Sequence, residues 1–420
     1  MTDSVSVVIP THNRRASLER LLGTLASQTW HPQLAEIIVV ADGCNDDTVA
    51  AVPDRAGAAP VRVIELAGCG AAIARNTGAE SAVHELLIFL DDDMEPGSDL
   101  IERYAAAAAP GVVLLGASYA HRNGAAFLDA GVRAWWEEHF RNLERPGHRY
   151  SYHDMLSGNF AITRSDFLAL GGFDTGLRCR EDYEFGIRLL RAGLAMEYLP
   201  AARTIHHESP SLQVSLRRAE NEGCADTGII RLHPSVRSTL LLSRYRDRRR
   251  RWPAAVLNSL AFRARGAGDL CARILRAGLG LTERLKMRGK WRRIYGALRE
   301  YHYWCGVVGV VGNEASLKKL AGPGGLSLPD ELIVDLSAGV ERAKSELHRR
   351  RPDSLRIIWG GIPIGRIPPM PGGEPLDSRH LVPALRGHMA DRLAGAMALS
   401  SSTPATEETC GLSDDWGNSE

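Results

Sequence analysis

The first 120 residues alternate between two patterns of apolar and polar positions. Short apolar runs, typical of buried strands, occupy residues 5–10, 37–40, 61–66 and 86–90. Between these runs, apolar residues recur at helical spacing from Ser17, a good N-cap, to about Gln28, and a second helix is expected from Gly70 to about Ala82. Apolar strands separated by helices predict a mostly parallel sheet covered on both faces, which is an α/β fold.

The remainder of the chain predicts further segments. A helix is expected from about 182 to 192, followed by a strand that ends at His206 and His207, and a linker at Ala321–Gly325 precedes a helix at about 331–348 and a strand at 355–359. We therefore expect a first domain over 1–210, a basic helical extension over 211–318, a small C-terminal α/β domain over 326–399 and a disordered tail over 400–420.

Composition predicts a protein with a hydrophobic core and limits the cellular compartment in which it is expected. Of 420 residues, 44% are apolar, which is enough for a substantial core. The seven cysteines are scattered and include no C-x-x-C pair, so free thiols in a reducing compartment are favoured over a disulfide framework or a structural zinc site. No signal-peptide pattern follows Met1 and no apolar run approaches a spanning helix, so we expect a cytoplasmic protein.

Charge is distributed unevenly, although the formal net charge is only +1. Between Arg237 and Glu300, 18 Lys and Arg residues face 4 Asp and Glu residues. Within this segment an apolar helical stripe runs beside arginines, and a run from Arg248 to Trp252 precedes it; the stripe comprises Leu270, Ile274, Ala277, Leu281 and Leu285. This pattern fits peripheral contact with an anionic membrane on its cytoplasmic side. A helix packed on the first domain with a solvated basic face fits equally, whereas nucleic acid is not an expected partner because no recognition motif accompanies the charge.

The most informative chemical feature is the triplet Asp91-Asp92-Asp93, which follows the apolar run 86–90. Three adjacent carboxylates repel one another, so a fold tolerates them at a buried strand's end mainly where a cation binds. Mg²⁺ or Mn²⁺ would suit oxygen ligands of this kind, usually one or two carboxylates together with substrate phosphates. Taken alone, the triplet also fits a solvated turn before Pro96.

Further polar residues follow the other predicted strands at the same sheet edge. Pro10-Thr11-His12-Asn13-Arg14 follows the first strand, Asp42 follows the second, and Arg75 lies on the helix after the third. Asp42 could accept hydrogen bonds from a base or ribose, and Arg75 could neutralise a phosphate, although each alone also fits an ordinary turn or surface helix. Together they indicate a nucleoside diphosphate and a metal at one edge, while neither a dinucleotide fingerprint nor a P-loop is present.

These segments occur in the order found in a known family. The blocks are Val7–Arg14, Val40–Gly43, Ala74–Gly78, Phe89–Asp93, Ser157–Ala161, Gly171–Asp174 and Glu181–Glu184, closed by His206. Over about residues 4–210 the chain resembles the family 2 glycosyltransferases with the GT-A fold, a Rossmann-like mixed sheet. The resemblance implies transfer of a sugar from a nucleotide-diphospho-sugar donor to a carbohydrate or lipid-linked acceptor, as in polysaccharide, glycolipid or glycoconjugate biosynthesis.

The resemblance also implies roles for individual residues. The position of Asp42 contacts the base, Asp91 faces the ribose, and Asp93 binds Mg²⁺ or Mn²⁺. His206 completes the metal or phosphate contact, although the neighbouring His207 leaves this register open by one residue. The remaining matched positions form two groups: Pro10, Thr11, Asn13, Arg14, Arg75 and Asp92 on the donor side, and Gly158 and Asn159 on the acceptor side.

The dipeptide Glu181-Asp182 resembles the catalytic-base motif of inverting members of the family. Asp182 as base would take the acceptor's proton during a single in-line displacement, which inverts the anomeric configuration. It is expected at a helix N-terminus, where the helix dipole would keep its carboxylate ionised. The alternative is that Asp182 only caps the helix.

Two other functions remain open from the same edge chemistry. A sugar nucleotidyltransferase would make the donor rather than consume it, but the loop after the first strand lacks the glycines that such enzymes use. A catalytically inactive scaffold that binds a nucleotide sugar is the second, and the intact Asp93 and Asp182 argue against it.

Overall fold

The computed structural model describes residues 4–29, 35–121, 126–208, 211–245, 254–322, 329–387 and 389–401. These residues fall into two compact units. The first contains residues 1–327 together with the short segment 370–374, and the second contains 328–369 and 375–420. The predicted tail lies outside the described residues apart from its first two positions. The run from Arg248 to Trp252 also lies outside them.

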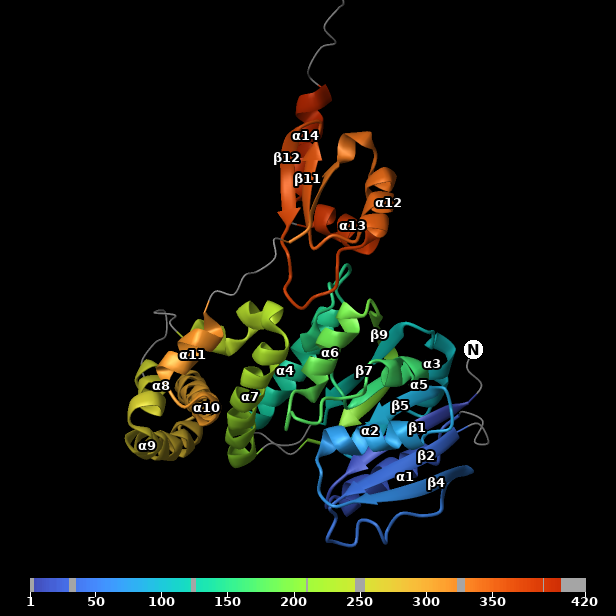
Figure 1. Ribbon diagram of the computed structural model, residues 1–420, viewed down its shortest axis with the longest axis vertical. Helices are drawn as coiled ribbons and strands as arrows, with labels where there is room; N and C mark the ends of the chain where they lie inside the picture. The colour runs from blue at the N-terminus through green and yellow to red at the C-terminus, as the bar shows by residue number, and fades with distance from the viewer. Residues whose placement is uncertain are drawn as a thin grey trace, which may run out of the picture. The chain divides into compact units, whose positions relative to one another are not determined.

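A nine-stranded mixed sheet forms the centre of the first unit (Figure 1). Its order is β3-β4-β2-β1-β5-β8-β7-β9-β6. The strands are β1 (Val5–Thr11), β2 (Ala35–Asp42), β3 (Arg55–Ala56), β4 (Ala59–Leu66), β5 (Leu86–Leu90), β6 (Met94–Pro96), β7 (Val112–Ala120), β8 (Asn159–Thr163) and β9 (Ala195–His206). β4, β2, β1 and β5 run parallel, whereas β8 is antiparallel to both β5 and β7. The α/β fold with a Rossmann-like mixed sheet is confirmed.

Helices cover both faces because each central strand is apolar on both sides. In β1, Val5, Val7 and Ile9 pack in one core with α1 and α3, while Val8 packs in another with α2, α5 and α6. The helices are α1 (Arg15–Leu25), α2 (Ala71–Ser81), α3 (Leu100–Ala107), α4 (Phe127–Leu143), α5 (Arg164–Ala169) and α6 (Glu181–Arg191). The expected N-cap at Ser17 is wrong by three residues: the N-cap of α1 is Arg14, whose side chain makes no capping hydrogen bond.

The basic helical section is part of the first unit and not a separate domain. It consists of α7 (Leu212–Leu232), α8 (Ala254–Arg263), α9 (Arg265–Arg284), α10 (Arg288–Val311) and α11 (Glu314–Ala321). Its apolar core includes Leu128 of α4 and Ile187 of α6, and buried Asp226 of α7 pairs with Arg180 beside α6. The expected boundary at residue 210 is therefore wrong, because α7 shares a core with residues of α4 and α6 and lies in the same compact unit as the sheet.

Two glycines allow α7 and α10 to approach closely. A Cβ at Gly306 would overlap the carbonyl oxygen of Glu220, and a Cβ at Gly223 would overlap that of Tyr303. We expect Gly306→Ala to lower the free energy of unfolding by about 3 kcal/mol, because both obstructing groups are backbone. Gly309→Ala, one turn along the same helix and in open space, should instead stabilise by about 0.5–1 kcal/mol. Urea unfolding of both variants tests this, and equal effects would contradict the packing argument.

A short segment between β12 and α13 also belongs to the first unit. Tyr152 N–H donates to the carbonyl of Gly372 at 3.0 Å, and Tyr150 N–H donates to the buried carboxylate of Glu374 at 2.9 Å. The N–H of Glu374 in turn donates to the carbonyl of Tyr150 at 2.8 Å. Residues 370–374 therefore supply an additional extended segment beside 150–152.

The second unit is a small α/β fold with its own core. A three-stranded sheet in the order β10-β11-β12 is joined by three helices. The elements are β10 (Glu331–Asp335), α12 (Val340–Arg350), β11 (Ser354–Trp359), β12 (Ile362–Ile367), α13 (Ser378–Arg386) and α14 (Ala390–Ser401). The helix expected over 331–348 is wrong in its first part. There residues 331–335 form a strand, in which Leu332 and Val334 are buried and Ile333 between them is exposed. Burial of every second residue is the pattern of a strand, whereas a helix buries residues three or four positions apart.

Candidate active site

Polar residues from three parallel strands surround one pocket at the carboxyl edge of the sheet. Its volume is about 270 Å³, and it is lined by Pro10, Thr11, His12, Arg14, Asp42, Ala71, Ala74, Arg75, Asp91 and Asp92. Seven of these lie at or just after the carboxyl ends of β1, β2 and β5, and an eighth is Arg75 of α2, which the sequence predicted as a site residue. The carboxyl ends of parallel strands meet at one edge, which is why residues far apart in sequence converge here.

The carboxylate of Asp42 organises the loop before α2. It accepts hydrogen bonds from the backbone N–H groups of Gly68, Cys69 and Gly70, at 3.0, 2.6 and 2.6 Å. Gly70 has a φ of 100°, in the region that favours glycine, and helix α2 begins directly after it. Asp42 therefore borders the pocket while fixing the loop on its rim, an arrangement that the Gly-Cys-Gly sequence before a helix could have indicated.

Ala71 and Ala74 on α2 are pocket residues that the sequence argument missed. They lie three positions apart, so they share the helix face that carries Arg75 toward the sheet. Their small side chains leave room beside the strand ends. Two alanines at this spacing next to an expected site residue were the available signal.

Arg75 is buried and bridges two carboxylates that are far apart in sequence. Its guanidinium donates to Asp91 at 2.5 Å and to Glu181 at 2.9 Å. Burial alone would lower the pKa of Arg75, but the negative charges of Asp91 and Glu181 raise it above its usual value. Arg75 thus ties the acidic triplet to the first residue of α6, and most of its charge is engaged by protein carboxylates.

The three aspartates occupy different environments. Asp91 is one-third exposed and pairs with Arg75, whereas Asp92 is buried and accepts hydrogen bonds from Thr11 at 2.8 Å and Arg14 at 2.9 Å. Burial raises the pKa of Asp92 to about 6, against the opposing charge of Arg14. Arg14 is half-exposed at the pocket and also donates to Asp93 at 2.8 Å. The triplet is therefore a structured, partly neutralised cluster and not a solvated turn.

The structure distinguishes the two adjacent histidines. Nε2 of His206 lies 3.3 Å from Oδ1 of Asp93, whereas Nε2 of His207 lies 2.5 Å from Glu95. β9 ends at His206, which is opposite Met94 of β6, and His207 is the first residue beyond the strand. His206 is therefore the histidine that accompanies the acidic triplet.

Asp93 and His206 fit a divalent cation that is completed by other ligands. Burial would raise the pKa of Asp93, but contact with His206 and Arg14 lowers it to about 2, so its carboxylate is ionised. Its Oδ1 is buried and receives no hydrogen bond of acceptable geometry from any described residue. The described residues contain no group of three or more His, Cys, Asp and Glu side chains placed to hold a metal. Mg²⁺ usually binds a protein through one or two carboxylates, with its remaining ligands from phosphates and water, so the Asp93 carboxylate suits it and His206 would be a second donor.

Glu181 and Asp182 begin α6, as expected. Glu181 is engaged with Arg75, and one carboxylate oxygen of Asp182 accepts a hydrogen bond from the N–H of Tyr183 at 2.8 Å. Burial and the adjacent charge of Glu181 raise the pKa of Asp182 to about 7. This raised pKa runs against the expectation that the helix dipole keeps the carboxylate ionised, because burial outweighs the favourable field of the helix N-terminus.

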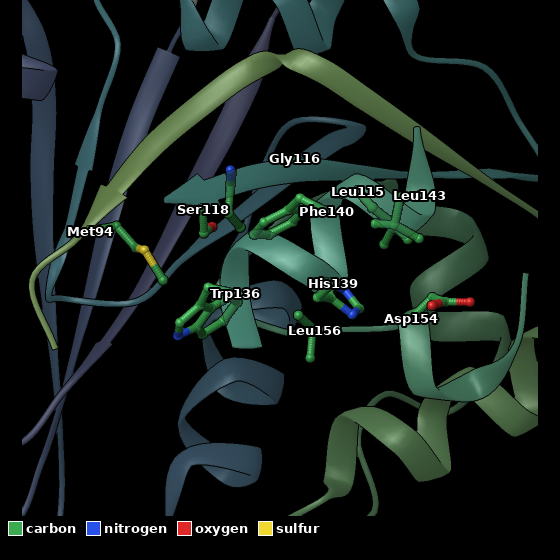
Figure 2. A pocket seen from close by; sticks show the side chains of 12 residues that line it. Met94, Leu115, Gly116, Ser118, Trp136, His139, Phe140, Leu143, Asp154 and Leu156 are labelled. Atoms are coloured by element: carbon green, nitrogen blue, oxygen red, sulfur yellow. The ribbon is translucent and has the colours of Figure 1, made fainter. Parts of the chain in front are cut away.

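A second cavity, of about 20 Å³, lies beside Trp136 (Figure 2). Figure 2 shows Trp136, His139 and Leu156 around it, and the ring of Trp136 contacts that of His206 edge-on at 5.1 Å between centroids. Gly158 borders the cavity where a Cβ would press on Asp91. The cavity has room for about one water molecule, so Trp136 fills space here more than it opens a site.

Asn159 is placed differently from the expected acceptor contact. Its amide group donates to the carbonyls of Ala117 and Ala202 and accepts a hydrogen bond from the hydroxyl of Tyr104 at 2.8 Å. The side chain is buried, and its hydrogen-bonding groups are all engaged inside the sheet. An acceptor could therefore reach Asn159 only by displacing one of these bonds.

Comparison with known proteins identifies the N-terminal part of the chain. Residues 6–171 match the model of glycosyl transferase family 2, and residues 137–209 match that of the N-terminal domain of galactosyltransferase. Validoxylamine A glucosyltransferase of Streptomyces hygroscopicus subsp. limoneus is 32% identical over 270 residues, covering 55% of this chain and 57% of that protein. O-antigen biosynthesis protein RfbC of Myxococcus xanthus is 29% identical over 226 residues, covering 50% of this chain and 18% of that protein. The chain thus spans less than two thirds of the length of these curated relatives.

Among solved structures, the mannosyltransferase PcManGT of Pyrobaculum calidifontis, in complex with GDP-Man and Mn²⁺, is similar with a TM-score of 0.47 at 20% identity. The match covers 71% of this chain and 85% of that one.

No helix among the described residues is both long enough and apolar enough to span a membrane.

Proposed function

Because the chain belongs to glycosyl transferase family 2 over residues 6–171, we propose that it transfers a sugar from a nucleotide-diphospho-sugar donor to an acceptor hydroxyl, with a divalent metal and with inversion. One observation carries the proposal: a pocket of about 270 Å³ is lined by Asp91, Asp92, Arg14 and Arg75. Arg14 also pairs with Asp93, and Arg75 pairs with Glu181, which Asp182 follows in sequence. Such a network supplies both the charge for a diphosphate and a base.

The donor is proposed to bind across the ends of β1, β2 and β5. Pro10, Thr11 and Asp42, which line the pocket, would contact the nucleoside, and Asp91 would face the ribose. Asn13 lies next to these residues in sequence but is not among the lining residues of the pocket. Asn13 holds the neighbouring loop by accepting a hydrogen bond from the N–H of Asn45 at 2.9 Å. The half-exposed guanidinium of Arg14 would provide positive charge for the diphosphate. Arg75 is more deeply buried and would add positive charge from the inner side of the pocket.

Asp93 and His206 are proposed to hold Mg²⁺ or Mn²⁺, and Asp92 to support them through Arg14 and Thr11. When bound, the metal would stabilise the negative charge that develops on the leaving diphosphate. The protein's own contribution is preorganisation: the carboxylates and Arg14 are already held in place by one another, so little rearrangement is required when the donor binds.

Asp182 is proposed as the base that takes the proton of the attacking acceptor hydroxyl. A pKa near 7 places its carboxylate close to the optimum for a general base at neutral pH. Glu181 is proposed to act on the donor side through Arg75, since its carboxylate is bonded to that guanidinium. Direct attack on the anomeric carbon, with Asp182 opposite the leaving group, would invert the configuration.

The acceptor is proposed to be a carbohydrate or a lipid-linked carbohydrate. The relatives include a protein named for O-antigen biosynthesis and one named for glucosylation of validoxylamine A, so a role in polysaccharide, glycolipid or glycoconjugate biosynthesis is supported without a choice among them. Gly158 would mark the acceptor side, where its lack of a side chain leaves space next to Asp91.

A donor panel tests the proposal. We expect one class among UDP-, GDP- and dTDP-sugars to stabilise the protein in the presence of Mn²⁺, by about 2–3 kcal/mol at a hundredfold excess over the dissociation constant. The same donor should release a nucleoside diphosphate during slow hydrolysis or transfer, and the matching sugar 1-phosphate should do neither. Release of pyrophosphate from a nucleoside triphosphate and a sugar 1-phosphate would instead identify a nucleotidyltransferase. Stabilisation without turnover would identify a binding scaffold.

A further inference from the structure

Helix α9 is apolar on two opposite faces, but only one of them is packed. Gly268, Ala272, Leu279 and Thr282 are buried against the other helices of the basic section. Leu270, Ile274, Leu281 and Leu285 are all exposed, by 58%, 64%, 59% and 59%. At 3.6 residues per turn, these four and the exposed Ala277 fall within about 80° of one another, on the side opposite the buried residues. We call these five residues the α9 stripe.

The α9 stripe is a continuous surface and not a set of scattered side chains. The helix runs without interruption from Arg265 to Arg284, through Gly278 and Gly280, so the spacing of the stripe is that of one regular helix. In Figure 1, α9 lies at the outer side of the helical section, away from the sheet. A row of large apolar residues that remain more than half exposed marks an interaction surface.

Basic residues accompany the α9 stripe. Arg273 and Arg284 flank it on one side, and Lys286, Arg288 and Lys290 continue from its end; all five are exposed. Between residues 263 and 293, ten Lys and Arg residues face two acidic ones. Both acidic side chains are engaged with the protein, since Asp269 accepts from Tyr301 and Glu283 from the N–H of Phe127. Within the described part of the chain, Arg273 and Arg284 form no ion pair. The surface is therefore apolar along its centre and positively charged along its edge.

We propose that the α9 stripe docks on an anionic lipid surface, with its apolar side chains in the acyl boundary and its arginines at the headgroup level. An apolar ridge with a basic border is the pattern by which a helix lies in the plane of an anionic membrane. A second copy of the chain is a poorer partner, because symmetric pairing of this face would bring two basic borders together. The sheet and its pocket belong to the same compact unit, so docking would hold that unit at the surface where lipid-linked acceptors lie.

Vesicle flotation with the full chain tests the proposal without any substrate, so its result is independent of the proposed activity. We expect flotation with vesicles that contain phosphatidylglycerol and phosphatidylcholine, but little with phosphatidylcholine alone. Raising the salt from about 0.01 M to about 1 M should release the protein, because it shortens the Debye length about tenfold. A wild-type protein that does not float with anionic vesicles at low salt would overturn the proposal.

Two double variants separate the apolar contribution from the charged one. Ile274→Ser with Leu281→Ser should weaken partitioning at least about tenfold, and Arg273→Gln with Arg284→Gln should weaken it by about tenfold or more at low salt but little at high salt. The matched control is Val83→Ser, which removes an apolar side chain that is 74% exposed elsewhere in the unit and should float like wild type.

The variants also discriminate against self-association. Light scattering of the wild type should give a monomer whose mass does not change in the Ile274→Ser, Leu281→Ser variant, and thermal unfolding should show that both double variants remain folded. Variants that float like wild type would overturn the proposal. A dimer that the serine variant dissociates would overturn it in favour of pairing between copies.

Discussion

Replacing Asp93 by alanine should lower the rate of metal-dependent sugar transfer by about 10³-fold or more. This is the effect expected when the protein no longer holds the metal that stabilises the negative charge on the leaving diphosphate. Contact with His206 and Arg14 lowers the pKa of Asp93, its Oδ1 is buried without a well-directed hydrogen bond, and His206 lies beside it. The variant should also lose most Mn²⁺ binding in the presence of the nucleoside diphosphate, which titration calorimetry measures without turnover.

The chain provides a matched control in the next carboxylate–histidine pair. Glu95 and His207 lie within two positions of Asp93 and His206 in sequence and form the same kind of contact, but Arg14, which lines the pocket, pairs with Asp93 and not with Glu95. Glu95→Ala should therefore leave transfer and metal binding within about threefold of wild type. Equal losses in the two variants would mean that the pairs stabilise the strands, and an active Asp93→Ala protein would remove Asp93 from the proposed metal site.

Replacing Asp182 by asparagine should lower the transfer rate by about 10²–10⁴-fold while donor affinity changes little, because the amide keeps the shape of the side chain but cannot accept a proton. The wild-type rate should rise with pH up to about 7 and then level off, since the base acts only when deprotonated and burial raises its pKa to about 7. Steady-state rates between pH 5 and pH 8 measure this, together with donor binding in the variant.

The result for Asp182 has two informative alternatives. If Asp182→Asn transfers at the wild-type rate, the residue only caps α6, whose second position it occupies. If the variant loses donor binding as strongly as transfer, Asp182 supports Glu181 and Arg75 and does not act as the base. A loss of rate that is accompanied by loss of the pH dependence fits the base alone.

Sequence pattern predicted the parts of the fold that depend on local burial. The apolar runs at 5–10, 37–40, 61–66 and 86–90 are strands, because a strand covered on both faces must be apolar throughout. The alternating Leu332 and Val334 were assigned to a helix, since so short a run does not distinguish the two periods. The boundary at residue 210 was wrong for another reason: whether α7 shares a core with α6 is a long-range property that composition does not encode.

The candidate site was predictable in its location but not in its connections. That the residues after β1, β2 and β5 would converge follows from parallel strand ends meeting at one edge. That Arg75 would bond Glu181, 106 positions away, depends on how α2 and α6 pack. The choice between His206 and His207 required the register between β9 and β6, and the raised pKa of Asp182 required its burial.

The backbone bonds between residues 150–152 and 370–374 give the order of the chain a practical meaning. A fragment that stops after α11 would appear to keep the whole first unit, since the second unit begins later in the sequence. It would in fact lack the backbone partner of Tyr152 and the carboxylate that binds the N–H of Tyr150. A fragment of the first unit that keeps these bonds must therefore combine two discontinuous pieces of sequence, and the second unit is interrupted by a segment of the first.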